Sequence, residues 1–167
     1  MPSGITDASR PGGTVCPPCH RGDLSVERRQ SVTGPTATIT VRWREKLVFE
    51  GGGPGRPAVT VDGDSKIATS PVELLLVAAA TCTAADVVDM LPKMRVDLRG
   101  LQVEVRGARR DEHPRRFTAI QFHFRVSGTG ADETKVRRAV DLSLEKYCSV
   151  MHSLAPDIQV GYDVSLE

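Results

Sequence analysis

The sequence predicts an α+β fold with antiparallel sheets. Short segments in which apolar and polar residues alternate are typical of half-buried strands, and two longer apolar segments are typical of helices. In chain order these segments read β-β-β-α-β-β-α-β, with no repeated βα unit. That order favours antiparallel sheets over a doubly wound parallel sheet.

Three strands are predicted before the first helix. The apolar residues that define them are Ile39, Val41 and Trp43, then Leu47 and Phe49, then Val59 and Val61. The glycine-rich run over residues 51–55 predicts a loop, and Asp62-Gly63 predicts a turn after the third strand.

The first helix has a well-marked beginning. Ser70 is suited to the N-cap, Pro71 to the first helical position, and Glu73 to the acidic position of a capping box. Residues 74–80 are wholly apolar, so the helix is expected to be buried on most sides. Pro92 disfavours a helical conformation at the residue before it, so the helix is expected to end at residue 90 or 91.

The second half of the chain predicts an antiparallel pair of strands, a second helix and a last strand. The pair alternates through Leu101, Val103 and Val105 and then through Ile120, Phe122, Phe124 and Val126. The helix is expected over residues 132–152, with one apolar stripe made by Val136, Ala139, Val140, Leu144, Tyr147, Cys148 and Met151. Alternation over residues 158–166 predicts the last strand.

Length and charge limit the classes of function. A chain of 167 residues predicts one domain, which we place at residues 36–167, after a flexible Pro/Gly-rich extension at 1–35. The net charge of +1 gives no argument for a nucleic-acid partner or an anionic membrane. No apolar run approaches the roughly 20 residues of a transmembrane helix, and no secretory segment is visible, so we expect a cytoplasmic protein without a membrane partner.

Four cysteines are present: Cys16, Cys19, Cys82 and Cys148. In a reducing compartment such residues are more typical of reactive or metal-binding groups than of a disulfide framework. Cys82 and Cys148 are expected on the inward faces of the two predicted helices. They can form a disulfide if their Cα atoms come within about 7 Å. Spacing alone leaves two interpretations: buried thiols that only pack, or a redox pair.

Two segments resemble the OsmC/Ohr family. The first is Ser70-Pro71-Val72-Glu73-Leu74-Leu75-Leu76 with Cys82-Thr83-Ala84-Ala85-Asp86-Val87-Val88, and the second runs from Ala139 to Val150 through Tyr147-Cys148. The resemblance covers about Thr36 to Glu167 and is closer to the YhfA-type branch than to the hydroperoxide-resistance Ohr branch.

The resemblance implies an intertwined homodimer with two central cysteine-bearing helices, which reduces organic hydroperoxides. By similarity, Cys82 is the peroxidatic cysteine and Cys148 the resolving cysteine, which forms a disulfide with the Cys82 sulfenic acid. An external dithiol, lipoyl-type in the Ohr branch, reopens that disulfide, so no resident cofactor or metal is expected.

The family's acidic residue is displaced by one position. In the Ohr branch a Glu directly follows the helix-start proline, and this chain has Val72 there and Glu73 next. Nine residues separate Glu73 from Cys82, or about 13 Å along a helix, so only Glu73 of a partner subunit is expected to reach the thiol. Closing the capping box is the alternative role for Glu73.

A cation is needed to stabilise the Cys82 thiolate, because burial raises the pKa of a thiol. In the Ohr branch an Arg from the N-terminal strand region supplies it. The candidates here are Arg42, Arg44 and Arg56, and we select Arg44.

Outside the resemblance, Cys16-Pro17-Pro18-Cys19-His20 matches the C-x-x-C-H pattern of haem attachment. Zinc binding, electron transfer to the Cys82–Cys148 pair, and an exposed segment without a specific role are the other interpretations. His152 follows Cys148 by one turn and is a candidate to assist its deprotonation.

A second functional class also fits the sequence. The strongly apolar first helix and Val72 are compatible with a homodimer that binds an apolar small molecule with little or no peroxidase turnover.

Overall fold

The computed structural model describes residues 34–167, in which Ala37–Glu167 form one compact unit. The predicted extension at 1–35 falls outside the described residues except for its last two positions. The predictions made for Cys16, Cys19 and His20 therefore lie outside the described residues as well.

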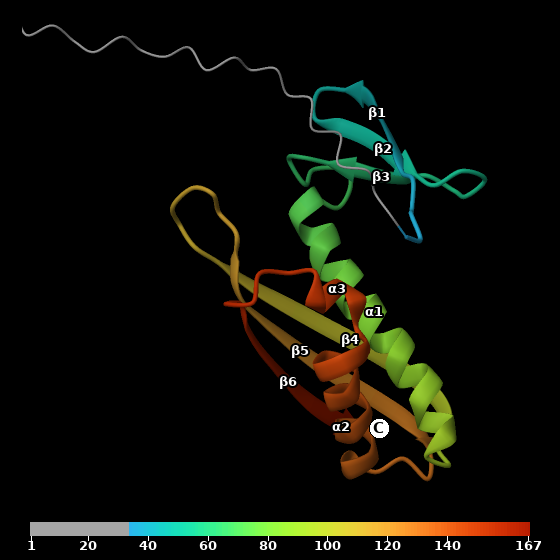
Figure 1. Ribbon diagram of the computed structural model, residues 1–167. Coiled ribbons are helices and arrows are strands. Elements are labelled where there is room, and N and C mark those ends of the chain that lie inside the picture. The colour runs from blue at the N-terminus through green and yellow to red at the C-terminus, as the bar shows by residue number, and fades with distance from the viewer. Residues whose placement is uncertain (1–33) are drawn as a thin grey trace, which may run out of the picture. The chain divides into compact units, whose positions relative to one another are not determined.

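The described chain has an α+β fold, as predicted (Figure 1). Its strands are β1 (Thr40–Glu45), β2 (Val48–Gly52), β3 (Val59–Asp62), β4 (Asp97–Arg109), β5 (Phe117–Thr129) and β6 (Gln159–Leu166). Its helical segments are α1 (Pro71–Lys93), α2 (Glu133–Leu142), the π-helical turn η1 (Ser143–Tyr147) and α3 (Ser149–His152). The strands form two three-stranded sheets, ordered β1-β2-β3 and β4-β5-β6.

The β1–β3 sheet is antiparallel and has two unlike faces. Val41, Gly51 and Val59 lie opposite one another across the three strands, and so do Trp43, Phe49 and Val61. Because side chains alternate along a strand, these residues share one apolar face. The row between them, which includes Arg42 and Glu50, points to the other face.

Helix α1 begins as predicted, with a complete capping box. The Ser70 hydroxyl accepts a hydrogen bond from the backbone N–H of Glu73, and the Glu73 carboxylate accepts one from the backbone N–H of Ser70 at 2.8 Å. The predicted end was wrong, because the helix continues past Pro92 to Lys93. Pro92 lies in the last turn, where a missing backbone donor removes a single bond of the helix.

The β4–β6 sheet corrects the prediction that all strand pairs are antiparallel. Strands β4 and β5 form a long antiparallel hairpin, whereas β5 and β6 run parallel. The segment between β5 and β6 holds α2, η1 and α3. Parallel neighbours need such a crossover connection, and alternation within single strands does not reveal pairing direction.

The helix predicted over residues 132–152 is interrupted. Helix α2 ends at Leu142, η1 follows, and Cys148 has an extended backbone with ψ of 95° before α3 begins. The backbone N–H of Cys148 donates to the carbonyl of Ser143, five residues earlier, at 2.8 Å. This five-residue step buries both Ser143 and Cys148 and leaves Tyr147 exposed, so the predicted place of Tyr147 on the buried stripe was wrong.

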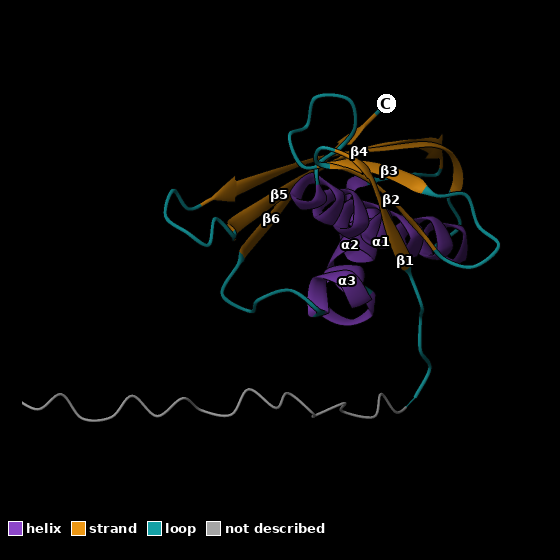
Figure 2. Ribbon diagram, turned by 90° about the horizontal axis from the view of Figure 1, so that it is seen from above, coloured by secondary structure: helices purple, strands orange, loops and turns teal. Residues whose placement is uncertain are grey.

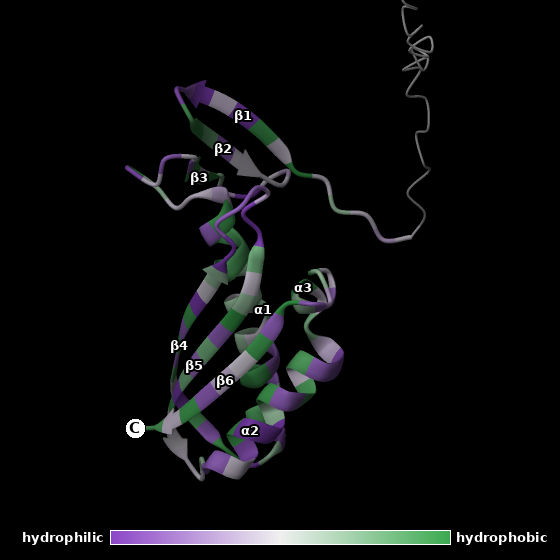
Figure 3. Cartoon of the chain, turned by 90° about the vertical axis from the view of Figure 1, so that its left-hand side faces the viewer, coloured by the Kyte–Doolittle hydropathy of each residue, from purple (hydrophilic) through white to green (hydrophobic). Residues whose placement is uncertain are grey.

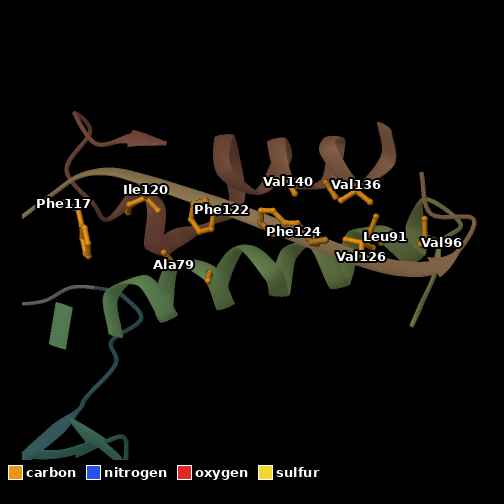
Figure 4. Packing of buried hydrophobic residues seen from close by; sticks show 13 residues of the cluster. Ala79, Leu91, Val96, Phe117, Ile120, Phe122, Phe124, Val126, Val136 and Val140 are labelled. Atoms are coloured by element: carbon orange, nitrogen blue, oxygen red, sulfur yellow. The ribbon is translucent and has the colours of Figure 1, made fainter. Parts of the chain in front are cut away.

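The core lies between the β4–β6 sheet and the helices. Figures 1 and 2 show α1 and α2 on one face of that sheet. The largest fully buried side chains are Phe122 and Phe124 of β5, which lie in one cluster with residues of both helices (Figure 4). Burial of a phenylalanine side chain contributes about 2–3 kcal/mol, so β5 is the main anchor of both helices.

Helix α1 carries many hydrophobic residues (Figure 3). By length and composition alone it could cross a membrane, which the sequence analysis did not anticipate. Only 28% of its most apolar 18-residue window is buried within the single chain. Leu75, Val77 and Val88 are its large apolar side chains that stay exposed in the described chain.

Candidate functional site

The fold brings the segments that carry Cys82 and Cys148 into contact, since Thr83, the residue after Cys82, touches the Cys148 sulfur. Cys82 lies in the middle of α1, and Cys148 lies at the break between η1 and α3. Both thiols are free, with Cys148 fully buried and Cys82 half-buried. Cys82 is among the neighbouring groups that raise the pKa of the Cys148 thiol, after burial as the main cause.

The two thiols have different surroundings. Burial is the main cause that raises the pKa of the Cys148 thiol, because removal from water disfavours the thiolate. A hydrogen bond from the Thr83 hydroxyl acts in the opposite direction and lowers that pKa. Cys82, by contrast, is only half-buried and keeps part of its surface exposed to solvent. An incoming reagent therefore meets Cys82 first.

Thr83 places a hydroxyl against the buried thiol. Its Oγ1 donates to the Cys148 Sγ at 3.4 Å, and its side chain has no exposed surface. The contact joins α1 to the break after η1, across 65 residues of chain.

Asp86 and Ser143 form a second polar link between α1 and the π-helical turn. The fully buried Ser143 hydroxyl donates to the Asp86 carboxylate at 2.6 Å. The backbone carbonyl of Ser143 also accepts the hydrogen bond from the N–H of Cys148. Ser143 thus connects Asp86 directly to the residue that carries the buried thiol.

Glu73 is held at the beginning of α1, nine positions before Cys82 in the same helix. Hydrogen bonds from the Ser70 hydroxyl, the Ser70 backbone N–H and the Ser65 hydroxyl lower the pKa of its carboxyl. These contacts show the capping role that the sequence left open. They do not bring Glu73 to the thiol of its own chain.

The three candidate arginines lie on or beside the small sheet. Arg44 forms an ion pair with Glu50 across β1 and β2. Arg42 and Arg56 line an open surface hollow together with Glu50. In the described part of the chain, these contacts link the arginines to the polar face of the sheet and none of them involves Cys82.

His152 and the metal interpretation receive no geometric support from the described residues. The His152 ring is exposed, and the contact that the structure gives to Cys148 is from the His152 backbone N–H to the Cys148 carbonyl at 3.1 Å. Within residues 34–167, no group of three or more His, Cys, Asp or Glu side chains is placed to hold a metal ion.

Sequence reasoning missed Thr83 and Ser143 as site residues. Ala79, Thr83, Val87 and Leu91 form a fully buried stripe along α1 at four-residue spacing. A hydroxyl in such a stripe requires a buried partner, and that signal was present in the sequence. Ser143 gave the same signal, because an uninterrupted helix places it three, four and seven positions after the buried Val140, Ala139 and Val136.

Comparison with known proteins gives the family. The chain matches the family model described as OsmC-like protein over residues 62–163. Protein YhfA of Escherichia coli strain K12 is 44% identical over 127 residues, which cover 74% of this chain and 95% of the relative. These matches confirm the resemblance inferred from the two cysteine segments.

Solved structures share the same fold. An OsmC-like protein from Mycoplasma pneumoniae matches with a TM-score of 0.69 at 18% identity, covering 80% of this chain and 99% of that one. An organic hydroperoxide resistance protein OsmC from Legionella pneumophila matches with a TM-score of 0.60 at 14% identity, again over 80% and 99%. With fold, sequence and family model in agreement, the chain belongs to the OsmC-like protein family.

Proposed function

We propose that this protein reduces organic hydroperoxides through a dithiol–disulfide cycle of Cys82 and Cys148. The observation that carries the proposal is the contact of Thr83, the residue after Cys82, with the Cys148 sulfur, which places two free thiols of unequal burial on neighbouring segments. The fold shared with a protein named for organic hydroperoxide resistance supports the choice of substrate.

The unequal burial supports the roles of Cys82 as the peroxidatic cysteine and Cys148 as the resolving cysteine. The half-buried Cys82 thiolate attacks one oxygen of the hydroperoxide, the O–O bond breaks, and an alcohol leaves after taking up a proton. The Cys82 sulfenic acid that results is next to the buried Cys148 thiol. Their condensation forms the disulfide and releases water, which prevents further oxidation of Cys82.

An external dithiol closes the cycle. Thiol–disulfide exchange transfers two electrons from that dithiol, for which a lipoyl-type compound is our candidate, to the Cys82–Cys148 disulfide. The protein then needs no resident cofactor or metal. We place it in the cytoplasm, where such reductants keep thiols reduced.

We propose a homodimer whose partner covers the exposed apolar surfaces. Val41 and Trp43 of β1 are 63% and 66% exposed, and Val77 of α1 is 46% exposed. A sheet with one hydrophobic face is stabilised when that face is buried against another element. A second copy of the chain supplies a matching apolar surface, in keeping with the intertwined dimers that the family resemblance implies.

Arg44 and Glu73 enter this proposal only through the partner subunit. Within one chain each is bonded elsewhere, Arg44 to Glu50 and Glu73 to Ser70 and Ser65. A role in stabilising the Cys82 thiolate therefore requires that dimer formation brings either residue to the thiol of the other subunit.

The test is peroxidase activity with matched cysteine variants. We expect the full chain to consume cumene hydroperoxide with dihydrolipoamide, and Cys82→Ser to reduce that rate to the uncatalysed one. Cys148→Ser should complete one turnover and then accumulate Cys82 sulfinic acid, seen by intact mass. The double variant Cys16→Ser/Cys19→Ser is the control and should keep its rate.

Equal rates for the unmodified chain and Cys82→Ser would refute the proposal. If one equivalent of hydroperoxide gives no disulfide and an apolar compound co-purifies with the protein, the ligand-binding function replaces it.

A further inference from the structure

The proposed cycle needs the thiolate of Cys148, which the fold buries completely. Cys148 has no exposed surface, and burial disfavours its charged form. The resolving step therefore requires a group that stabilises the Cys148 thiolate in place of the water that burial removes. Two groups lower the pKa of Cys148 by hydrogen bonding, the Thr83 hydroxyl and the backbone N–H of Met151 in α3, and the larger effect is that of Thr83, the one side chain of the two.

Thr83 meets this requirement. Its fully buried hydroxyl donates to the Cys148 Sγ at 3.4 Å, within the range of a hydrogen bond to sulfur. A hydroxyl placed in an apolar stripe costs free energy unless it is hydrogen-bonded. A valine would fill the same volume without that cost, so the hydroxyl is best explained by what it does for the sulfur.

On the basis of the proposed function, we propose that Thr83 stabilises the thiolate of Cys148 in both halves of the cycle. In the oxidative half, the Cys148 thiolate attacks the Cys82 sulfur, the S–S bond forms and the S–O bond breaks. The departing hydroxide takes the proton that Cys148 has lost and leaves as water. Thr83 keeps its own proton and only donates a hydrogen bond.

The same contact directs the reductive half. An external thiolate reaches the half-buried Cys82 sulfur, forms a mixed disulfide with it, and releases Cys148 as a thiolate. A thiol of lower pKa leaves faster, so the hydrogen bond from Thr83 favours attack on Cys82. Thr83 thus sets which sulfur the reductant attacks.

The direct test is titration of Cys148 without any peroxide chemistry. In a Cys16→Ser/Cys19→Ser/Cys82→Ser background, thiolate absorbance near 240 nm reports Cys148 alone. A hydrogen bond to a charged group contributes about 1.5–3 kcal/mol, so Thr83→Val should raise the Cys148 pKa by about one to two units. Thr83→Ser keeps the hydroxyl and should restore the original value.

A matched control lies on the other side of Cys82. The Thr81 hydroxyl donates to the carbonyl of Val77 in its own helix at 2.7 Å, and Thr81 is exposed. Thr81→Val should leave the Cys148 titration unchanged. If Thr83→Val does not fold, Thr83→Ala removes the same hydroxyl without adding a methyl group, and circular dichroism identifies the folded variant.

A kinetic measurement tests the reductive half. The disulfide is formed with diamide, which oxidises the dithiol independently of peroxidase activity, and is then reduced with dithiothreitol. We expect slower reduction in Thr83→Val and normal reduction in Thr83→Ser and Thr81→Val. An unshifted Cys148 titration in Thr83→Val would overturn the inference, whereas failure of the proposed peroxidase function alone would leave the titration result in place.

Discussion

At the scale of single residues, the unequal burial of Cys82 and Cys148 controls the chemistry. Cys82 is open to solvent on one side, whereas Cys148 is fully enclosed and its pKa is raised by burial. The first thiol can therefore meet a substrate, and the second can react only with a sulfur that is already beside it. This arrangement limits the reactions of Cys148 with external oxidants.

The raised pKa of Cys148 predicts how disulfide formation depends on pH. Below the pKa of a thiol, its thiolate fraction increases about tenfold per pH unit. For an ordinary cysteine this fraction levels off above about pH 8.5. We expect the rate of disulfide formation to keep rising past that pH, because burial holds Cys148 protonated. Rapid mixing with hydroperoxide followed by acid quench and intact mass measures the rate.

The control for this profile is Cys148→Ser, in which only sulfenic acid formation at Cys82 is observed. Its pH dependence separates the first step from the second. A rate of disulfide formation that levels off below pH 8 would contradict the raised pKa of Cys148.

At the scale of elements, the π-helical turn η1 is what aligns the second thiol. Regular α-helical spacing cannot bury two residues five positions apart on one face, and η1 buries both Ser143 and Cys148. The hydrogen bond from Ser143 to Asp86 fixes this turn to α1, three residues and less than one helical turn from the Thr83 contact. Two side-chain links between the same elements therefore hold Cys148 beside Cys82.

Removal of the Ser143 hydroxyl should loosen this alignment. Ser143→Ala leaves the half-buried Asp86 carboxylate without that donor, which predicts a loss of about 1–3 kcal/mol in the free energy of unfolding. Denaturant titration measures this loss, and intact mass should show more Cys82 sulfinic acid after hydroperoxide. Ser149→Ala, at an exposed position of α3, is the control. Equal stability of the two variants would contradict the role of Ser143.

Local patterns in the sequence identified most elements but not their pairing or irregularities. The capping box at Ser70 was predictable because its residues are adjacent in the chain and contact one another. The parallel pairing of β6 depends on how the crossover segment packs, and η1 depends on a contact between Ser143 and Asp86 across 57 residues. The sequence allowed Cys82 and Cys148 to lie close together but did not decide it. It also did not identify the Thr83 hydroxyl as a hydrogen-bond donor to Cys148.

At the scale of the whole molecule, the single chain leaves too much apolar surface uncovered. Figure 3 shows α1 as a mostly hydrophobic helix, and less than a third of its most apolar window is buried. The apolar face of the β1–β3 sheet, defined by Val41, Trp43, Phe49, Val59 and Val61, is the second uncovered surface. Contiguous exposed apolar surfaces of this kind are typical of protein interfaces.

The two faces of β1 provide a matched test of the homodimer. Val41 lies on the apolar face and its neighbour Thr40 on the polar face, and both are exposed in the single chain. A charge at an interface core is strongly unfavourable, so Val41→Lys should shift the mass in sedimentation equilibrium from twice the chain mass toward 18.1 kDa. Thr40→Lys adds the same charge one residue away and should remain dimeric. An unmodified chain that sediments at 18.1 kDa would exclude the homodimer, and with it any role of Arg44 or Glu73 at the thiol of a partner subunit.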